Sequence, residues 1–142
     1  MKLSGNGLEL IKKFEGFRPS PYKDIAGLLT IGFGHLILKN ESFTSLTKEE
    51  AETLLLKDVK WAEDCVNEKI NVQLTQNQFD ALVSFVFNLG CTAFFGSTLR
   101  KLVNNKDFTK AKGEFLKWCN AGGKKSPGLL RRRIDESVLF DQ

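Results

Sequence analysis

The chain has 142 residues, which is enough for one domain that buries its own core without metal or disulfide cross-links. Its hydrophobic content of 42% and charged content of 27% are ordinary for a globular protein and exclude a fibrous or disordered chain. The formal net charge is +4, so the surface favours polyanions such as nucleic acid, anionic lipid or an acidic cell wall.

The cysteines and the N-terminus indicate a cytosolic origin. Cys65, Cys91 and Cys119 do not lie at metal-ligand spacing and the chain has 1 histidine, so a structural zinc site is not expected. No cofactor or other metal is implied. An odd number of scattered cysteines predicts reduced thiols in a cytoplasm rather than a disulfide framework. The N-terminus lacks a signal-peptide core and no stretch approaches transmembrane length, so we expect no stable membrane insertion. A target outside the membrane would require another component to let the protein through.

The first third of the chain predicts a helix followed by a small sheet. Residues 3–14 carry apolar side chains at helical spacing, which indicates a short amphipathic helix. Pro19 and Pro21 then forbid a long helix and favour extended chain. Residues 22–38 mix glycines with β-branched, aromatic and aliphatic residues, so we expect a small antiparallel hairpin or three-stranded sheet there.

The rest of the chain predicts helices. A capping box at Thr47–Glu50 opens a helical pattern that we expect to run to about Ile70. A second capping box at Thr75–Gln78 opens a helix that is apolar nearly all round, typical of the centre of a domain, with Gly90 as its C′ residue. The remaining expected elements are helices near 98–105 and 107–119, a loop at 121–128, and a last helix at about 129–140.

These elements predict an α+β fold within a single domain covering residues 1–142. We expect a small β-rich lobe at about 15–46 and a helical lobe at about 47–142 that includes the N-terminal helix. A cleft between two lobes is a common location for a substrate site.

Three polar residues form the main candidate site. Glu15 ends the first helix between Phe14 and Phe17, whereas Asp24 lies in the turn that enters the sheet, so we expect two carboxyl groups in unlike environments. Glycoside hydrolysis needs such a pair, because one carboxyl protonates the leaving oxygen while the other activates water or attacks the sugar. Thr30, on the strand beyond, could hold that water by its hydroxyl. On spacing alone, such residues more often have only structural roles.

Residues 14–35 resemble the signature of phage lysozymes. The pattern is Glu-Gly, eight residues between Glu15 and Asp24, five residues between Asp24 and Thr30, and then Thr-Ile-Gly-Phe-Gly-His. The resemblance covers essentially the whole chain, because further segments match family motifs in the same order. These segments are Phe87–Gly90, Ser97–Arg100, Trp118 and Gly128–Glu136. The resemblance implies a lysozyme-like fold with the active-site cleft between a mostly helical lobe and the small β lobe.

The family resemblance implies a role for each residue of the candidate site. Glu15 would be the general acid, Asp24 the second carboxylate, and Thr30 a residue that seats the water. Phage-type members are similar to inverting enzymes, in which the two carboxyls stand roughly 6.5–9.5 Å apart to leave room for water.

Substrate-binding positions also follow from the resemblance. Leu36, Phe87 and Thr98 fall where related lysozymes line the sugar cleft, although the pattern around Phe87 alone indicates core. Lys112 stands where the family normally has a neutral polar sugar contact, so the chain departs from the family there.

Two basic features have a structural and a functional interpretation. His35 matches the family histidine, and we expect a structural role in which it pairs with a carboxylate. Arg131 or Arg132 could pair with Glu15 across the cleft; the alternative is a solvated basic face on the last helix.

The resemblance implies an endolysin that hydrolyses the β-1,4 bond between N-acetylmuramic acid and N-acetylglucosamine in bacterial peptidoglycan, lysing the host cell for phage release. It would be a monomer in the host cytoplasm that reaches the wall after a separate holin-like protein permeabilises the membrane. Two alternatives are a lytic transglycosylase on the same substrate and a non-catalytic wall-binding domain. Nucleic acid is not an expected partner, because no aromatic stacking platform accompanies the basic last helix.

Overall fold

The structure is a computed structural model that describes residues 1–142. The chain forms two compact units. One contains residues 11–60; the other contains residues 1–10 and 61–142. No helix is both long enough and apolar enough to cross a membrane.

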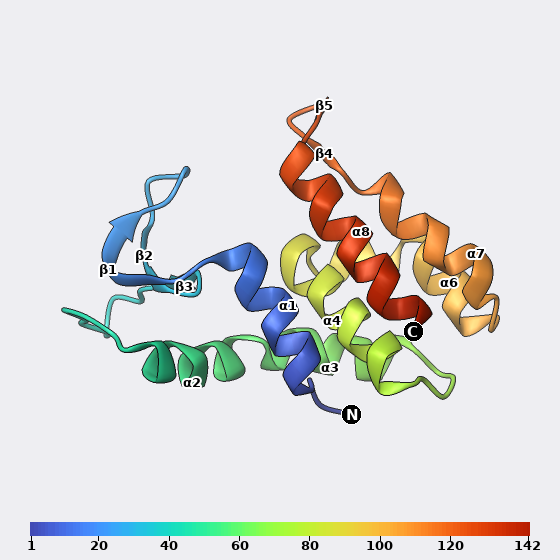
Figure 1. The fold of residues 1–142 in the computed structure, drawn as a ribbon, viewed down its shortest axis with the longest axis horizontal. Helices are drawn as coiled ribbons and strands as arrows, with labels where there is room; N and C mark the ends of the chain where they lie inside the picture. Colours follow the sequence, from blue (N-terminus) through green and yellow to red (C-terminus); the bar gives the residue numbers. More distant parts are fainter. The chain divides into compact units, whose positions relative to one another are not determined.

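The unit of residues 11–60 contains a three-stranded antiparallel sheet that packs against a helix (Figure 1). It receives the end of α1 (Gly5–Glu15) and then forms β1 (Arg18–Lys23), β2 (Leu29–Gly32), β3 (His35–Leu36) and α2 (Lys48–Asp58). One face of the sheet is closed by α2: Ile31 on β2 is 0% exposed, and Ala51 and Leu55 on α2 are each 1% exposed. The predicted sheet at 22–38 is therefore confirmed, and it begins earlier than expected, at Arg18.

The prolines explain an irregularity in the first strand. Tyr22 pairs with Thr30, but the register shifts between Tyr22 and Arg18. Pro19 and Pro21 lie within this stretch and have no N–H to donate to the neighbouring strand, so the chain stays extended while the ladder is interrupted.

The unit of residues 1–10 and 61–142 is helical and centred on α4 (Gln76–Leu89), in which residues 79–86 are all buried. The last helix, α8 (Pro127–Asp141), packs along α4, as Figure 1 shows. The other elements are α3 (Lys60–Lys69), α5 (Cys91–Phe95), α6 (Thr98–Asn104), α7 (Phe108–Glu114), a 3-10 turn (Phe115–Lys117), β4 (Asn120–Ala121) and β5 (Lys124–Lys125).

Both predicted capping boxes are present. The Thr47 hydroxyl accepts from the Glu50 N–H at 3.1 Å, and the Glu50 carboxylate accepts from the Thr47 N–H at 2.9 Å. Thr75 and Gln78 make the same reciprocal pair. Each box satisfies N–H groups that the first helical turn leaves without a partner, which is why these two helix starts were readable from sequence.

The single helix expected over residues 47–70 is wrong, because it is two helices separated at Val59. The change coincides with the boundary between the compact units. Leu55 is buried in one unit, whereas Ala62 and Val66 are buried in the other. The apolar side chains of residues 47–70 therefore pack into two different cores. No glycine or proline marks the break, which lies where the buried apolar residues change from one core to the other.

The segment expected to be a loop at 121–128 instead contains a tight hairpin and the start of α8. Asn120 pairs with Lys125 and Ala121 with Lys124. The two residues between the strands are Gly122 and Gly123, with φ of 59° and 80°. Two consecutive positive φ angles are what the common two-residue hairpin turn requires, and glycine adopts them without strain.

The expectation of three reduced thiols is wrong for two of the cysteines. Cys65 of α3 and Cys91 of α5 form a disulfide across a sequence separation of 26, and only Cys119 is free and buried. The bond encloses the whole of α4, the central helix of its unit. Scattered spacing gave no sign of the pairing, because the fold of α3, α4 and α5 brings the two cysteines together.

Candidate active site

The end of α1 places Glu15 at the edge of the sheet unit. Gly16 follows with φ of +72°, a left-handed conformation that lets the chain leave the helix. Immediately after it, Phe17 packs on Phe33 of the β2–β3 turn, with ring centroids 5.4 Å apart. This aromatic pair fixes the direction of the chain just beyond Glu15, whose side chain is half-buried.

The β2–β3 turn lies directly against the Glu15 carboxylate. A Cβ added at Gly34 would stand 2.8 Å from Oε1 of Glu15, closer than real contacts allow, and Gly34 has φ of +75°. Only glycine suits both the backbone conformation and the close approach. The second glycine of the Gly-Phe-Gly-His run is thus explained by a contact with the candidate general acid.

Asp24 closes the turn between β1 and β2. Its Oδ1 accepts from the Leu28 N–H at 2.9 Å, and its main chain exchanges hydrogen bonds with Gly27 and Leu28. The structure gives no hydrogen bond to Oδ2, and the residue is exposed. One carboxylate oxygen therefore shapes the turn while the other is available to a ligand or water.

Thr30 lies on β2 and is 4% exposed. Its hydroxyl donates to the Leu28 carbonyl at 2.9 Å. Since the single hydroxyl proton is used there, the oxygen can only accept hydrogen bonds from any further partner. The register pairs Thr30 with Tyr22 on one side and Leu36 on the other, so these three side chains share one face of the sheet.

His35 pairs with a carboxylate, as predicted, and the structure adds a second one. Nδ1 lies 2.8 Å from Oδ2 of Asp58, and Nε2 lies 2.9 Å from Oε1 of Glu41. Burial lowers the pKa of His35, but the hydrogen bonds and charges of Glu41 and Asp58 outweigh burial and raise the pKa above its ordinary value. Sequence reasoning missed Glu41, which lies in a segment without regular structure.

The three candidate substrate-binding residues lie on different elements. Leu36 is on β3 and is 44% exposed. Phe87 is half-buried near the end of α4, 6.0 Å from the Trp61 ring, and Thr98 is an exposed residue at the start of α6. Lys112, the position that departs from the family, pairs with Asp141 at 2.8 Å.

The arginines of α8 divide into two kinds. Arg131 is exposed, whereas Arg132 and Arg133 are 4% and 0% exposed and surround Glu136, which is itself 0% exposed. Arg133 Nε lies 2.7 Å from Oε1 of Glu136, and the Ser84 hydroxyl donates to Oε2 of Glu136 at 2.6 Å. The alternative of a solvated basic face therefore fits Arg131 alone. Arg132 and Arg133 stand four and three residues before Glu136, a spacing at which helical side chains meet, so the sequence alone could have predicted these ion pairs.

Comparison with known proteins agrees with this architecture. The phage lysozyme family model matches residues 12–136. The endolysin of Acyrthosiphon pisum secondary endosymbiont phage 1 is 44% identical in an alignment that covers 99% of this chain and 99% of that protein. The solved structure of a mutant of P22 lysozyme is 38% identical, with a TM-score of 0.92, over 100% of this chain and 99% of that one.

A second solved structure is also similar over nearly its whole length. The muramidase domain of SpmX from Asticaccaulis excentricus is 38% identical, with a TM-score of 0.89, over 99% of this chain and 98% of that one. The predicted lysozyme-like α+β fold is confirmed by these likenesses. Because the family model and a relative that matches along its full length agree, this chain belongs to the phage lysozyme family.

Proposed function

We propose that this protein is an endolysin that hydrolyses the β-1,4 bond between N-acetylmuramic acid and N-acetylglucosamine in bacterial peptidoglycan. The observation that carries the proposal is the Glu15 carboxylate at the end of α1 beside Gly34, within the residues that the phage lysozyme family model matches. The same compact unit contains Asp24 and Thr30, the two other residues that the reaction requires.

The first step of the proposed reaction is protonation of the leaving group. Glu15 donates a proton to the glycosidic oxygen as the bond to the anomeric carbon breaks and positive charge develops on the sugar ring. Because Gly34 has no side chain, its backbone can lie close to the Glu15 carboxyl group.

The second step is attack by a water molecule that Thr30 and Asp24 orient. The Thr30 hydroxyl donates its hydrogen bond to the Leu28 carbonyl, so its oxygen accepts a hydrogen bond from that water. Oδ2 of Asp24 accepts a hydrogen bond from the other hydrogen of the water and takes that proton as the water attacks. A lone pair of the water oxygen is then directed away from both groups, toward the anomeric carbon. Attack opposite the leaving group inverts the configuration at the anomeric carbon.

Sugar binding and access to the substrate complete the proposal. Leu36, Phe87 and Thr98 contribute apolar and hydroxyl contacts to the glycan. We propose that the protein acts as a monomer, accumulates in the host cytoplasm, and meets peptidoglycan after a separate holin-like protein opens the membrane. The excess positive charge raises its rate of encounter with an anionic wall.

The catalytic part of the proposal is tested by Glu15→Gln. Removing the proton donor should lower kcat on purified peptidoglycan by at least about a hundredfold while the melting temperature stays near that of the wild type. Glu49→Gln is the matched control, since Glu49 is an exposed glutamate of α2 in the same compact unit. Retention of most activity by folded Glu15→Gln would contradict the assignment.

A further inference from the structure

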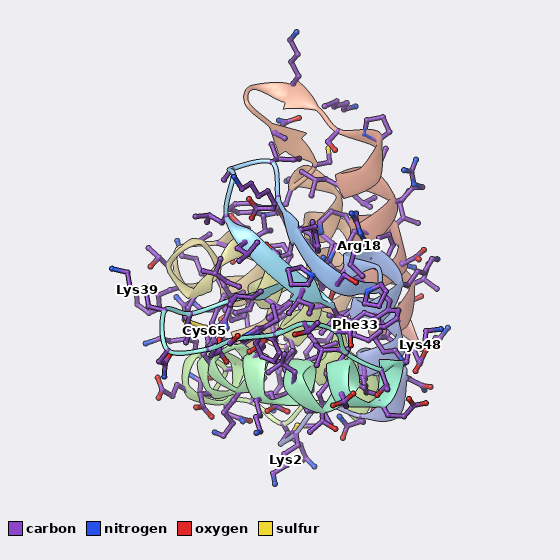
Figure 2. The ribbon with its side chains drawn as sticks, turned by 90° about the vertical axis from the view of Figure 1, so that its left-hand side faces the viewer. Lys2, Arg18, Phe33, Lys39, Lys48 and Cys65 are labelled. Carbon is purple, nitrogen blue, oxygen red and sulfur yellow. A yellow bond between two sulfur atoms is a disulfide. The ribbon has the colours of Figure 1, made fainter.

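Arg18, the first residue of β1, and Tyr22, its fifth, form a stacked pair beside the proposed active site. The guanidinium carbon of Arg18 lies 4.2 Å from the centroid of the Tyr22 ring, the geometry of a cation–π contact. Figure 2 shows Arg18 on β1. Arg18 is exposed, and the structure gives it no carboxylate partner. Its charge is held in place yet is free to bind an anion.

The chain between the two residues is stiff. Pro19 and Pro21 fix their own φ angles and restrict the residue before each of them. The Pro19 carbonyl also accepts a hydrogen bond from the Leu46 N–H at 2.9 Å. The restricted backbone and the Tyr22 ring already order the Arg18 side chain. Binding of an anion to Arg18 therefore loses less side-chain conformational entropy than binding to a mobile arginine would.

The pair lies on the same face of the sheet as the water-seating threonine. Tyr22 is directly opposite Thr30, and Thr30 is directly opposite Leu36, so the ring that Arg18 covers is the cross-strand neighbour of Thr30. Asp24 follows Tyr22 by two residues. An anion bound by Arg18 would therefore be part of the substrate that occupies this face.

The chemistry of a planar guanidinium selects carboxylates, which it binds with two parallel hydrogen bonds. The N-acetylated sugars of a glycan strand are uncharged, whereas the peptide branches on the muramoyl residues carry carboxylates. We propose that Arg18, supported by Tyr22, is a specificity-determining contact for the carboxylates of these peptide branches. The inference rests on the proposed function, and it assigns Arg18 to binding and not to the chemical step.

The test compares two forms of one substrate. Purified peptidoglycan strands are used as they are, or after carbodiimide coupling with methylamine has converted their carboxylates into neutral amides, and new reducing ends are measured. Wild type should lose about tenfold in kcat/KM on the amidated strands, mainly through KM, because one charge-assisted contact is lost. Arg18→Gln should already be about tenfold lower on native strands and lose little more on amidation.

Three further variants sharpen the result. Arg18→Lys keeps the charge but loses the planar fork, so it should fall between wild type and Arg18→Gln. Tyr22→Leu removes the support and should reduce the discrimination between the two substrates, whereas Tyr22→Phe should retain it. The matched control is Lys39→Gln, which removes one charge from an exposed side chain that projects away from the ribbon in Figure 2. It should discriminate as wild type does.

The outcomes separate this inference from the proposed function. If Arg18→Gln loses the same factor on both substrates, or loses nothing on native strands, the carboxylate contact is refuted while hydrolysis stands. If wild type releases no reducing ends from either substrate, the proposed function itself fails.

Discussion

The stability of this protein should depend on pH through His35. The imidazole joins β3 to Asp58 at the end of α2 and to Glu41 in the connecting segment. The His35 side chain is 10% exposed, and those of Asp58 and Glu41 are 26% and 25% exposed, so these ion pairs are intermediate between surface and core. The contact with Asp58 should contribute about 1.5 kcal/mol, above a typical surface pair and below a fully buried one.

The direction of the pH dependence follows from the pKa shifts. The pKa of His35 is raised above 6.5 in the folded protein. The contribution of His35 to the free energy of unfolding is therefore complete below pH 6.5 and is lost as the pH rises through the folded-state pKa. On the acid side, the backbone N–H of Leu38 and the contact with His35 lower the pKa of Glu41 below 4.5. Its stabilisation is present above pH 4.5 and is lost as pH falls through the folded-state value. Burial raises the pKa of Asp58 despite His35, so Asp58 loses its charge earlier on acidification. The cluster should contribute most near about pH 6.

The assay is chemical denaturation of wild type and His35→Gln between pH 5.5 and pH 9. Near about pH 6 the variant should lose at least about 1.5 kcal/mol of unfolding free energy, or about 5 °C in Tm for a chain of this length. At pH 9 the difference should fall to well under half, because the wild-type imidazole is then neutral. A difference that stays constant across this range would refute the charge argument and leave only packing.

Three further outcomes are expected. Thr30→Val, which keeps the shape but removes the acceptor for water, should lower kcat about a hundredfold, and Thr30→Ser should restore much of it; equal rates for both variants would exclude the hydroxyl role. Gly34→Ala should lower kcat more than tenfold with a stability cost of about 1 to 3 kcal/mol, because its Cβ meets the Glu15 carboxylate; a fully active variant would show that the contact is unimportant. Reducing the Cys65–Cys91 disulfide should lower the unfolding free energy by about 3 kcal/mol in a melt with reductant, and Cys65→Ser should not respond to reductant.

Local chemistry explains which elements could be predicted from the sequence. The capping boxes at Thr47 and Thr75 are each complete within four residues, and residues 79–86 are mostly apolar, a pattern that can be recognised without knowing what they contact. By contrast, the separation of α2 from α3 at Val59 depends on two cores that are assembled from distant parts of the chain. The hairpin around Gly122 and Gly123 could have been predicted from the sequence, because two consecutive glycines favour a two-residue hairpin turn.

The candidate site divides in the same way. The spacing of Glu15, Asp24 and Thr30 is distinctive only as part of the family pattern, since acidic residues are common in any chain of this composition. The contact between Gly34 and Glu15 joins α1 to the sheet, and the second carboxylate on His35 comes from an irregular segment, so neither has a periodic signal. These contacts cannot be predicted before the register of the sheet is known, because the register determines which residues lie beside each other.

The central claim is hydrolysis by water that the protein orients. Its most direct test is mass spectrometry of the fragments that the enzyme releases from purified peptidoglycan in heavy-oxygen water. The proposed reaction predicts fragments that end in reducing N-acetylmuramic acid and carry the label at the new end. Unlabelled fragments with anhydro ends would contradict it, because they would identify a transglycosylase and leave Asp24 and Thr30 without the roles assigned to them.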